Sequence, residues 1–186
     1  MTQPVPEKSV CVYCGSRPGD TPDFTDEAET LGSGLAAAGL RLVYGAGDVG
    51  LMGSVARAAQ AAGGRTFGVI PQHLVDREVG KTDLTTYVVT ETMHERKKVM
   101  FMNCDAVVVL PGGAGSLDEL FEVLTWRQLG LHEKPIFLVN TDNYWTPLMQ
   151  LLEHVVARGF ADASLLGFIT LVSGADDALH ALSSRI

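Results

Sequence analysis

The sequence predicts an α/β fold: one doubly wound domain with a mainly parallel sheet and helices on both faces. Strand-like apolar runs alternate with helical patterns along the whole chain, which is typical of a parallel sheet. The run from Ala106 to Leu110 has no polar alternation, as expected for a strand covered on both faces. A chain of 186 residues, 46% of them hydrophobic, is long enough to bury one such core. We expect this domain over 9–186, after a flexible N-terminal tail at 1–8.

The charge balance argues against two classes of partner. The 14 Lys and Arg residues against 22 Asp and Glu give a net charge of −8, so neither nucleic acid nor a membrane surface is expected as a partner. No apolar run approaches the roughly 18 residues that a membrane span needs, and 1–8 lacks the features of a secretion signal. Three cysteines leave one unpaired in any disulfide scheme, and we expect a cytoplasmic protein.

Cys11 and Cys14 form a C-x-x-C pair, a spacing that redox enzymes and zinc sites use. Cys11 lies inside an apolar run, and no second cysteine pair or histidine cluster accompanies it, so burial is the simpler interpretation. No metal site is predicted, because these histidines lack metal-ligand spacing: His132, His154 and His180.

The expected elements follow one another from end to end. Strands are expected over 10–13, 40–44, a run ending at 71, 86–89, 106–110, 135–139 and 168–172. Helices are expected over 22–38, 51–62, 93–104, the segment from 116 to about 129, 145–158 and 175–183. The first helix shows the clearest apolar stripe and is followed by Gly39 as its C-cap. The members of this stripe recur at helical spacing: Phe24, Ala28, Leu31 and Leu35.

Glycine-bearing turns follow the first two strands. Gly15-Ser16 can offer N–H and hydroxyl groups to a ligand, or it can serve as a plain connection. Gly45 to Gly50 matches the G-x-G-x-x-G pattern of dinucleotide-binding proteins. It follows the second strand, however, and the next strand ends without the acid that a dinucleotide ribose needs. Gly45 and Gly47 are therefore expected to line a mononucleotide site or to serve only as packing glycines.

The polar connection from Pro71 to Thr86 is too long for an ordinary loop between a strand and the next element. It carries charged side chains, among them Arg77 and Glu78. We interpret it as a lid or binding loop.

The helix that begins at Met93 carries an arginine in an apolar stripe. Met93, Met100 and Cys104 share one face at helical spacing, and Arg96 falls on that same face. A buried guanidinium is paired or binds an anion, and its fixed fork of donors suits a phosphate or carboxylate. The alternative is an arginine that extends along the rim of the core into solvent. Neighbouring Lys97 could assist in binding an anion.

A glycine-rich turn joins the strand at 106–110 to the next helix. Pro111 ends the strand because it has no N–H for the ladder. Gly112, Gly113 and Gly115 let the backbone approach a ligand closely, and the following helix directs its free N–H groups and positive dipole end toward the same point. The turn predicts a phosphate site.

The sequence allows two interpretations of Glu119. Ser116 and Glu119 have the S-x-x-E spacing of a capping box, in which the glutamate only accepts a hydrogen bond from the backbone of the cap. Alternatively, its carboxylate faces the ligand.

Two sides of this helix are expected to pack against other parts of the protein. One apolar stripe holds Leu117, Leu120, Phe121 and Leu124. The other side carries Glu119, Glu122, Val123 and Trp126, and a second helix or a subunit would cover Val123 and Trp126.

Taken together, these motifs resemble the LOG (LONELY GUY) phosphoribohydrolases, a family also labelled lysine decarboxylase-like. Residues 111–119 are similar to its PGGxGTxxE signature, with Ser116 in place of the threonine. The glycine triplet of the family reads Gly45-Ala46-Gly47 in this chain. The resemblance covers most of the chain and includes 14–16, 50–53, 68–71, 93–97, 125–130 and 134–135.

The resemblance implies a Rossmann-like nucleotide-binding catalytic domain that needs no metal or organic cofactor. The implied reaction is hydrolysis of the N-glycosidic bond of cytokinin riboside 5′-monophosphates, and of AMP, to free base and ribose 5-phosphate. Arg96 and Glu119 map onto the catalytic pair, and at least a homodimer is implied, with Trp126 and Arg127 as interface candidates. The expected substrate-binding residues are Gly15, Ser16, Gly45, Gly47, Glu78, Met93, Lys97, Gly112, Gly113, Ala114, Gly115 and Ser116.

Two rival functions are weighed against this one. A nucleotide-binding or sensing module would use the same pocket without turnover, but the presence of both Arg96 and Glu119 counts against it. Amino-acid decarboxylation normally needs a lysine-linked pyridoxal cofactor, and Lys97 and Lys98 follow Arg96 in a setting better suited to phosphate.

Overall fold

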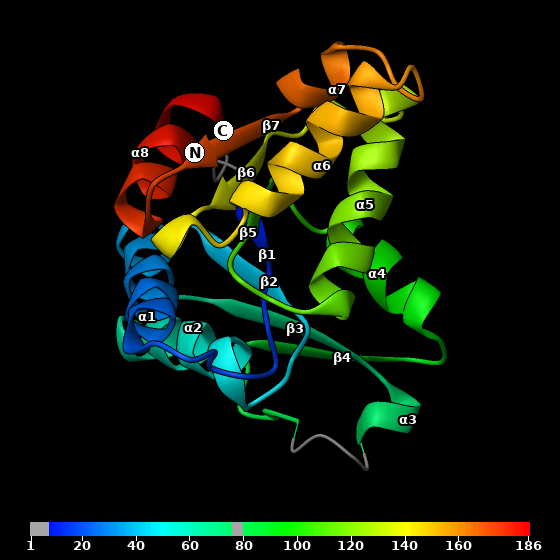
Figure 1. The fold of residues 1–186 in the computed structure, drawn as a ribbon. Helices are drawn as coiled ribbons and strands as arrows, with labels where there is room; N and C mark the ends of the chain where they lie inside the picture. Colours follow the sequence, from blue (N-terminus) through cyan, green and yellow to red (C-terminus); the bar gives the residue numbers. More distant parts are fainter. Residues whose placement is uncertain (1–7, 76–79) are drawn as a thin grey trace, which may run out of the picture.

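The structure, a computed structural model, describes residues 8–75 and 80–186 (Figure 1). In this part of the chain a seven-stranded sheet has the order β4-β3-β2-β1-β5-β6-β7, and every neighbouring pair is parallel. Its strands are β1 (Ser9–Tyr13), β2 (Arg41–Tyr44), β3 (Thr66–Pro71), β4 (Thr86–Thr90), β5 (Ala106–Val109), β6 (Ile136–Val139) and β7 (Ile169–Val172). The predicted doubly wound α/β fold is confirmed.

Helices cover both faces of the sheet, as Figure 1 shows. One face carries α1 (Pro22–Ala37), α2 (Gly50–Ala61) and α8 (Ala175–Arg185). The other carries α4 (Met93–Met102), α5 (Ala114–Gln128), α6 (Thr146–Ala157) and the short α7 (Ser164–Gly167). Along β1, Val10 and Val12 join the first layer while Cys11 and Tyr13 join the second, because successive strand side chains point to opposite faces.

The first helix begins and ends where the sequence predicts. The Thr21 hydroxyl accepts a hydrogen bond from the Asp23 N–H at 3.4 Å, Pro22 occupies the first turn, and Gly39 follows with a φ of +70°. Its predicted stripe is buried: Phe24, Ala28, Leu31 and Leu35. No helix in the described residues is long and apolar enough to cross a membrane.

Three short elements were not expected from the sequence: α3 (Gln72–Val75), the 3₁₀ helix η1 (Thr141–Asn143) and α7. Helices of three or four residues contain too little repeat for a period to be recognised. The α3 helix lies in the long connection after β3, while 76–79, and with it Glu78, lies outside the described residues. At the N-terminus, Lys8 is described and its Nζ lies 3.2 Å from Asp105; the rest of the expected tail, 1–7, is outside the described residues.

The packing of α5 differs from the expected pattern at one position. Phe121 was expected in the buried stripe, but it is 38% exposed. The helix instead buries Ser116, Glu119, Leu120, Val123 and Leu124. The expected second helix over Val123 and Trp126 is α4, whose Phe101 ring lies 5.0 Å from the Trp126 ring. The side of α5 that carries Trp126 therefore faces α4, and Phe121 on another side of the helix is left partly exposed.

The order of the strands places a crevice at one edge of the sheet. β1 and β5 are neighbours, but the chain continues from them toward opposite sides of the sheet, so their loops separate. The Gly15 N–H donates to the Pro111 carbonyl at 3.0 Å, and the Gly15 carbonyl accepts from the Leu51 N–H at 3.1 Å. The turn after β1, the start of α2 and the glycine loop after β5 therefore meet at this crevice.

Close packing of α1 against α2 gives a test of the fold. A Cβ added at Gly32 of α1 would lie 2.2 Å from the Val55 carbonyl oxygen of α2, which is backbone and cannot move alone. Gly32→Ala should therefore lower the free energy of unfolding by about 1–3 kcal/mol. The control is Gly167→Ala, where an added Cβ meets no atom within 4 Å and stability should hold or rise slightly. Denaturant unfolding measures both, and a Gly32→Ala protein as stable as the parent would contradict this packing.

Candidate active site

A cavity of about 850 Å³ opens at the crevice between the loops after β1 and β5. The turn after β1, the glycine loop after β5 and the starts of α2, α4 and α5 all contribute to its walls. The residues predicted from the sequence that line it are Gly15, Ser16, Gly45, Met93, Arg96, Gly112, Gly113, Ala114, Gly115, Ser116 and Glu119.

Two predicted binding residues lie outside this cavity. Gly47 forms an isolated antiparallel bridge with Gly80 and does not line the cavity wall. The Nζ of Lys97 lies 2.9 Å from Asp118 and 3.3 Å from Glu122, so this side chain is directed toward α5. Adjacent residues of a helix point in different directions, which explains why Arg96 lines the cavity and Lys97 does not.

The start of α5 forms a site suited to an anion. The helix begins at Ala114, and within the described residues no partner is recorded for the N–H groups of Ala114, Gly115 and Ser116 or for the Ser116 hydroxyl. A Cβ added at Gly113 or Gly115 would meet no protein atom within 4 Å, so both glycines border open space. Free donors and a positive helix end at the same point favour phosphate.

Arg96 is held beneath this site by the sheet and by α5. Arg96 is only 7% exposed, so the alternative prediction, an arginine at the rim of the core that reaches into solvent, is wrong. Nε donates to the Val69 carbonyl at 3.1 Å, Nη2 donates to the Gly45 carbonyl at 3.1 Å, and Nη1 lies 3.8 Å from Glu119 Oε1. Two backbone carbonyls thus fix the guanidinium, and Nη1 is left facing the carboxylate and the cavity.

The capping box that was one of the two interpretations of Ser116 and Glu119 is not formed. Because α5 begins at Ala114 with Gly113 as its N-cap, Ser116 already lies inside the helix. A capping box exists instead at the start of α4, where the Thr92 hydroxyl accepts from the Glu95 N–H and the Glu95 carboxylate accepts from the Thr92 N–H. Glu119 is therefore free of capping, and its carboxylate faces Arg96.

The buried position of Glu119 changes its acidity. Burial raises the pKa of Glu119 to about 7. The positive charges of Arg96 and Lys97 act against this rise, and the negative charges of Asp118 and Glu122 add to it. A carboxyl group with a pKa near 7 exchanges its proton readily at neutral pH. This property suits a group that accepts a proton during a reaction.

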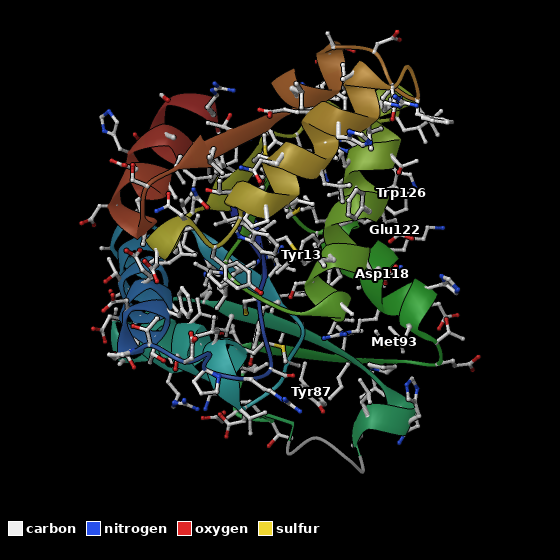
Figure 2. All side chains as sticks on the ribbon, in the orientation of Figure 1. Tyr13, Tyr87, Met93, Asp118, Glu122 and Trp126 are labelled. Atoms are coloured by element: carbon white, nitrogen blue, oxygen red, sulfur yellow. The ribbon has the colours of Figure 1, made fainter. Side chains whose placement is uncertain are left out.

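Lys97 braces α4 against α5 next to this carboxylate. Burial alone would lower the pKa of Lys97, but its hydrogen bond to Asp118 and its interactions with Glu122 outweigh burial and raise it. The ammonium therefore stays charged. Figure 2 shows Asp118 and Glu122 on consecutive turns of α5, with Met93 at the start of α4 below them.

The cysteines are buried and free, in agreement with the simpler interpretation of the C-x-x-C pair. Cys14 lines the cavity, and burial raises the pKa of its thiol far above the usual range, so it stays neutral. Within residues 8–75 and 80–186, no group of three His, Cys, Asp or Glu side chains is placed to hold a metal ion.

The sequence did not indicate several of the residues that line the cavity. Arg17 and Asp20 continue the turn after Ser16, and their adjacency to that turn was an available signal. Leu74 belongs to the unexpected α3, and Tyr144 comes from the loop after β6. The sequence places Asn140 at the end of β6, but nothing in it shows that Tyr144 reaches the glycine loop.

These features define a Rossmann-like α/β protein in which a helix start suited to an anion lies beside a buried Arg–Glu pair. The chain belongs to the family whose model carries the description "Possible lysine decarboxylase", which matches residues 52–182, and the resemblance to the LOG phosphoribohydrolases is confirmed.

Two relatives show how far the similarity extends. The chain is 41% identical over 185 residues to the cytokinin riboside 5′-monophosphate phosphoribohydrolase of Rhodococcoides fascians, with 99% of this chain and 93% of the relative covered. It is 42% identical over 157 residues to LOG5 of Arabidopsis thaliana, a protein of the same name, with 84% and 69% covered. Among solved structures, the molybdenum cofactor carrier protein of Chlamydomonas reinhardtii shares the fold, with a TM-score of 0.75, 19% identity and 96% and 98% coverage.

The raised pKa of Glu119 predicts a pH-dependent stability. Because the folded protein holds this proton up to about pH 7 and the unfolded chain releases it near 4.5, folding weakens as the pH rises through this window. Relative to the parent, Glu119→Gln should gain about 2–3 kcal/mol of unfolding free energy between pH 5 and pH 8. Urea unfolding at a series of pH values measures this difference. Parallel curves for the two proteins would contradict a carboxyl group buried in this way.

Proposed function

We propose that the protein hydrolyses the N-glycosidic bond of cytokinin riboside 5′-monophosphates, and of AMP, releasing the free base and ribose 5-phosphate. The observation that carries the proposal is a buried carboxylate, Glu119, one helical turn beyond a helix start whose N–H groups suit an anion. The curated relatives, which are named for this activity, support it.

The spacing along α5 matches the arrangement of a nucleotide 5′-phosphate. Three residues of α-helix advance about 4.5 Å along the axis, so Glu119 lies about that far from Ser116. A phosphate bound by the Ser116 hydroxyl and the free N–H groups at the helix start would place the attached ribose beside Glu119. The binding energy of the phosphate then serves to position the sugar for reaction.

Glu119 acts on the ribose and on the attacking water. As the C1′–N bond breaks, positive charge develops on the ribosyl ring, and the negative carboxylate of Glu119 stabilises it, as carboxylates do in glycoside hydrolysis. Water forms the new C1′–O bond and gives a proton to Glu119, and the base leaves with its bonding electron pair and takes up a proton from solvent. The products are the free base and ribose 5-phosphate, and Glu119 returns its proton to solvent.

Arg96 has two parts in this proposal. Its guanidinium keeps the Glu119 carboxylate in place, and its N–H groups that are not bound to Gly45 or Val69 face the reacting end of the nucleotide. There they stabilise the negative charge that develops on the departing base. The low exposure of both side chains strengthens these interactions.

Four further properties of the protein remain predictions: one catalytic domain over 9–186, a cytoplasmic location, no cofactor and a homodimer. Within the chain, Trp126 packs on Phe101 and the Arg127 guanidinium lies 5.7 Å from the Phe168 ring, so both interface candidates also have internal packing roles. The residue roles in binding and catalysis are likewise proposals.

Decarboxylation is disfavoured by the position of the lysines. A pyridoxal cofactor requires a lysine in the cavity for its covalent linkage. None of the described lining residues is a lysine, and Lys97 is 5% exposed and held by acidic residues of α5. The other rival, a binding module without turnover, would bind AMP but release no base.

The activity itself is tested by release of free base from isopentenyl-AMP and AMP. Glu119→Gln should lower kcat by about 10²–10⁴-fold, because it removes the proton acceptor and the charge. Arg96→Lys should lower it at least about tenfold, since an ammonium lacks the fork that binds two carbonyls. Glu153→Gln makes the same chemical change at an exposed site on α6 and should keep parental activity. Tight AMP binding without base release by the parent would favour the binding module instead.

The pH dependence tests the role of Glu119 separately. A proton acceptor with a pKa of about 7 predicts that kcat falls about tenfold per pH unit below neutrality. Saturating substrate is needed, because the phosphate itself ionises at a pH of about 6. Lys97→Met should move this fall to higher pH, because the Lys97 charge lowers the pKa of Glu119; Lys98→Met is the control on the same helix. A fall that is unmoved, or moved to lower pH, would count against Glu119 as the acceptor.

A further inference from the structure

The loop between β6 and α6 reaches the rim of the cavity in an unusual backbone conformation. Asp142 (φ 52°) and Asn143 (φ 58°) are consecutive residues in the left-handed region, which Asp and Asn adopt more readily than other residues with a side chain but usually one at a time. The Asn140 side chain stabilises this turn: its Oδ1 accepts from the Trp145 N–H at 2.7 Å and its Nδ2 donates to the Thr146 hydroxyl at 3.2 Å. The turn is therefore held in one conformation at the edge of the cavity.

The consequence of this turn is the placement of Tyr144. Its ring packs edge-to-face on Phe24 at 5.6 Å and on Trp145 at 4.8 Å, which fixes its direction although it is 40% exposed. Its hydroxyl donates to the Gly112 carbonyl at 2.7 Å. A residue from the β6–α6 loop thus holds one peptide of the glycine loop after β5.

That peptide is easily reoriented unless something holds it. It lies between Gly112 and Gly113, whose lack of side chains permits many backbone conformations. In a trans peptide the carbonyl oxygen and the following N–H point in opposite directions, and the described chain contains no cis peptide. Holding the Gly112 oxygen at Tyr144 therefore fixes the direction of the Gly113 N–H, for which no partner is recorded in the described residues.

We propose that Tyr144 is a positioning residue that orients the Gly112–Gly113 peptide so that the Gly113 N–H binds the substrate phosphate. A reversed peptide would direct the Gly112 oxygen toward the free donors at the start of α5 and would repel an anion. That the anion is a nucleotide phosphate rests on the proposed function. The contact between the Tyr144 hydroxyl and the Gly112 carbonyl does not depend on it.

The test compares two tyrosine hydroxyls in the same protein. Tyr144→Phe keeps the ring contacts and removes the hydrogen bond to Gly112. The control is Tyr87→Phe on β4 (labelled in Figure 2), because the Tyr87 hydroxyl is buried and has no hydrogen-bond partner among residues 8–75 and 80–186. Calorimetry would measure the dissociation constants of AMP and of adenosine, which lacks the phosphate. Tyr144→Phe should weaken AMP binding about tenfold and leave adenosine within about twofold, since a hydrogen bond to a charged group is affected. Tyr87→Phe should change neither.

In turnover, KM for AMP should rise by a similar factor while kcat stays within about threefold, because binding is lost equally before and during reaction. AMP affinity of Tyr144→Phe within twofold of the parent would overturn the proposal. Equal losses for AMP and adenosine would also overturn it, since they would indicate general disruption. Tyr144→Leu removes the ring as well as the hydroxyl. If Tyr144→Phe binds AMP like the parent and only Tyr144→Leu binds it more weakly, the ring packing and not the hydrogen bond is responsible, and the proposal is wrong. Binding is measured with Glu119→Gln present in every protein compared, because its slow turnover preserves AMP. A parent that binds AMP but releases no base would refute the proposed function alone.

Discussion

The Arg96 guanidinium connects the parts of the molecule on which the candidate site depends. It donates to the carbonyl of Gly45 at the end of β2 and to the carbonyl of Val69 in β3, and it faces Glu119 of α5. A buried charge needs such partners, because unpaired it would be strongly disfavoured. The same contacts that stabilise the arginine therefore fix the distance between the sheet and the helix that carries the carboxylate.

The order of the strands explains why this pair lies beside the proposed anion site. The loops diverge at the point between β1 and β5, and α5 starts there with N–H groups that have no recorded partner among the described residues. Close approach of the loops demands glycine at Gly50, where a Cβ would lie 2.3 Å from the Ser16 backbone and φ is +58°. At Gly113 and Gly115, by contrast, the protein itself leaves space open. The first kind of glycine serves packing, and the second leaves room for a ligand.

Two departures from the family pattern leave the cavity intact. Ala46 has a positive φ (58°) and is fully buried, and it does not line the cavity. Ser116 retains a hydroxyl at the start of α5 that can donate a hydrogen bond to an anion. Neither difference alters the charged pair of Arg96 and Glu119.

Much of this could be predicted from the sequence because it depends on local patterns. Apolar runs and helical stripes predicted the sheet and its main helices, and an arginine in an apolar stripe indicated either a buried, partnered Arg96 or one at the rim of the core. What could not be predicted depends on contacts between distant segments. The capping box, one of two interpretations of Glu119, required the helix to begin after Ser116, but the helix begins at Ala114. Lys97 is directed toward α5 by Asp118 and Glu122, which are distant in sequence. The reach of Tyr144 to Gly112 depends on two unusual φ angles that no periodicity indicates.

A crystal structure of the Glu119→Gln protein with AMP would show whether α5 binds the phosphate and presents position 119 to the ribose, because slow turnover would preserve the substrate. We expect phosphate oxygens within about 3 Å of the Ser116 hydroxyl and the N–H groups at the start of α5. The ribose should lie against the side chain at position 119, next to Arg96. AMP bound with its phosphate away from α5, or with its ribose out of reach of position 119, would rule out this mechanism.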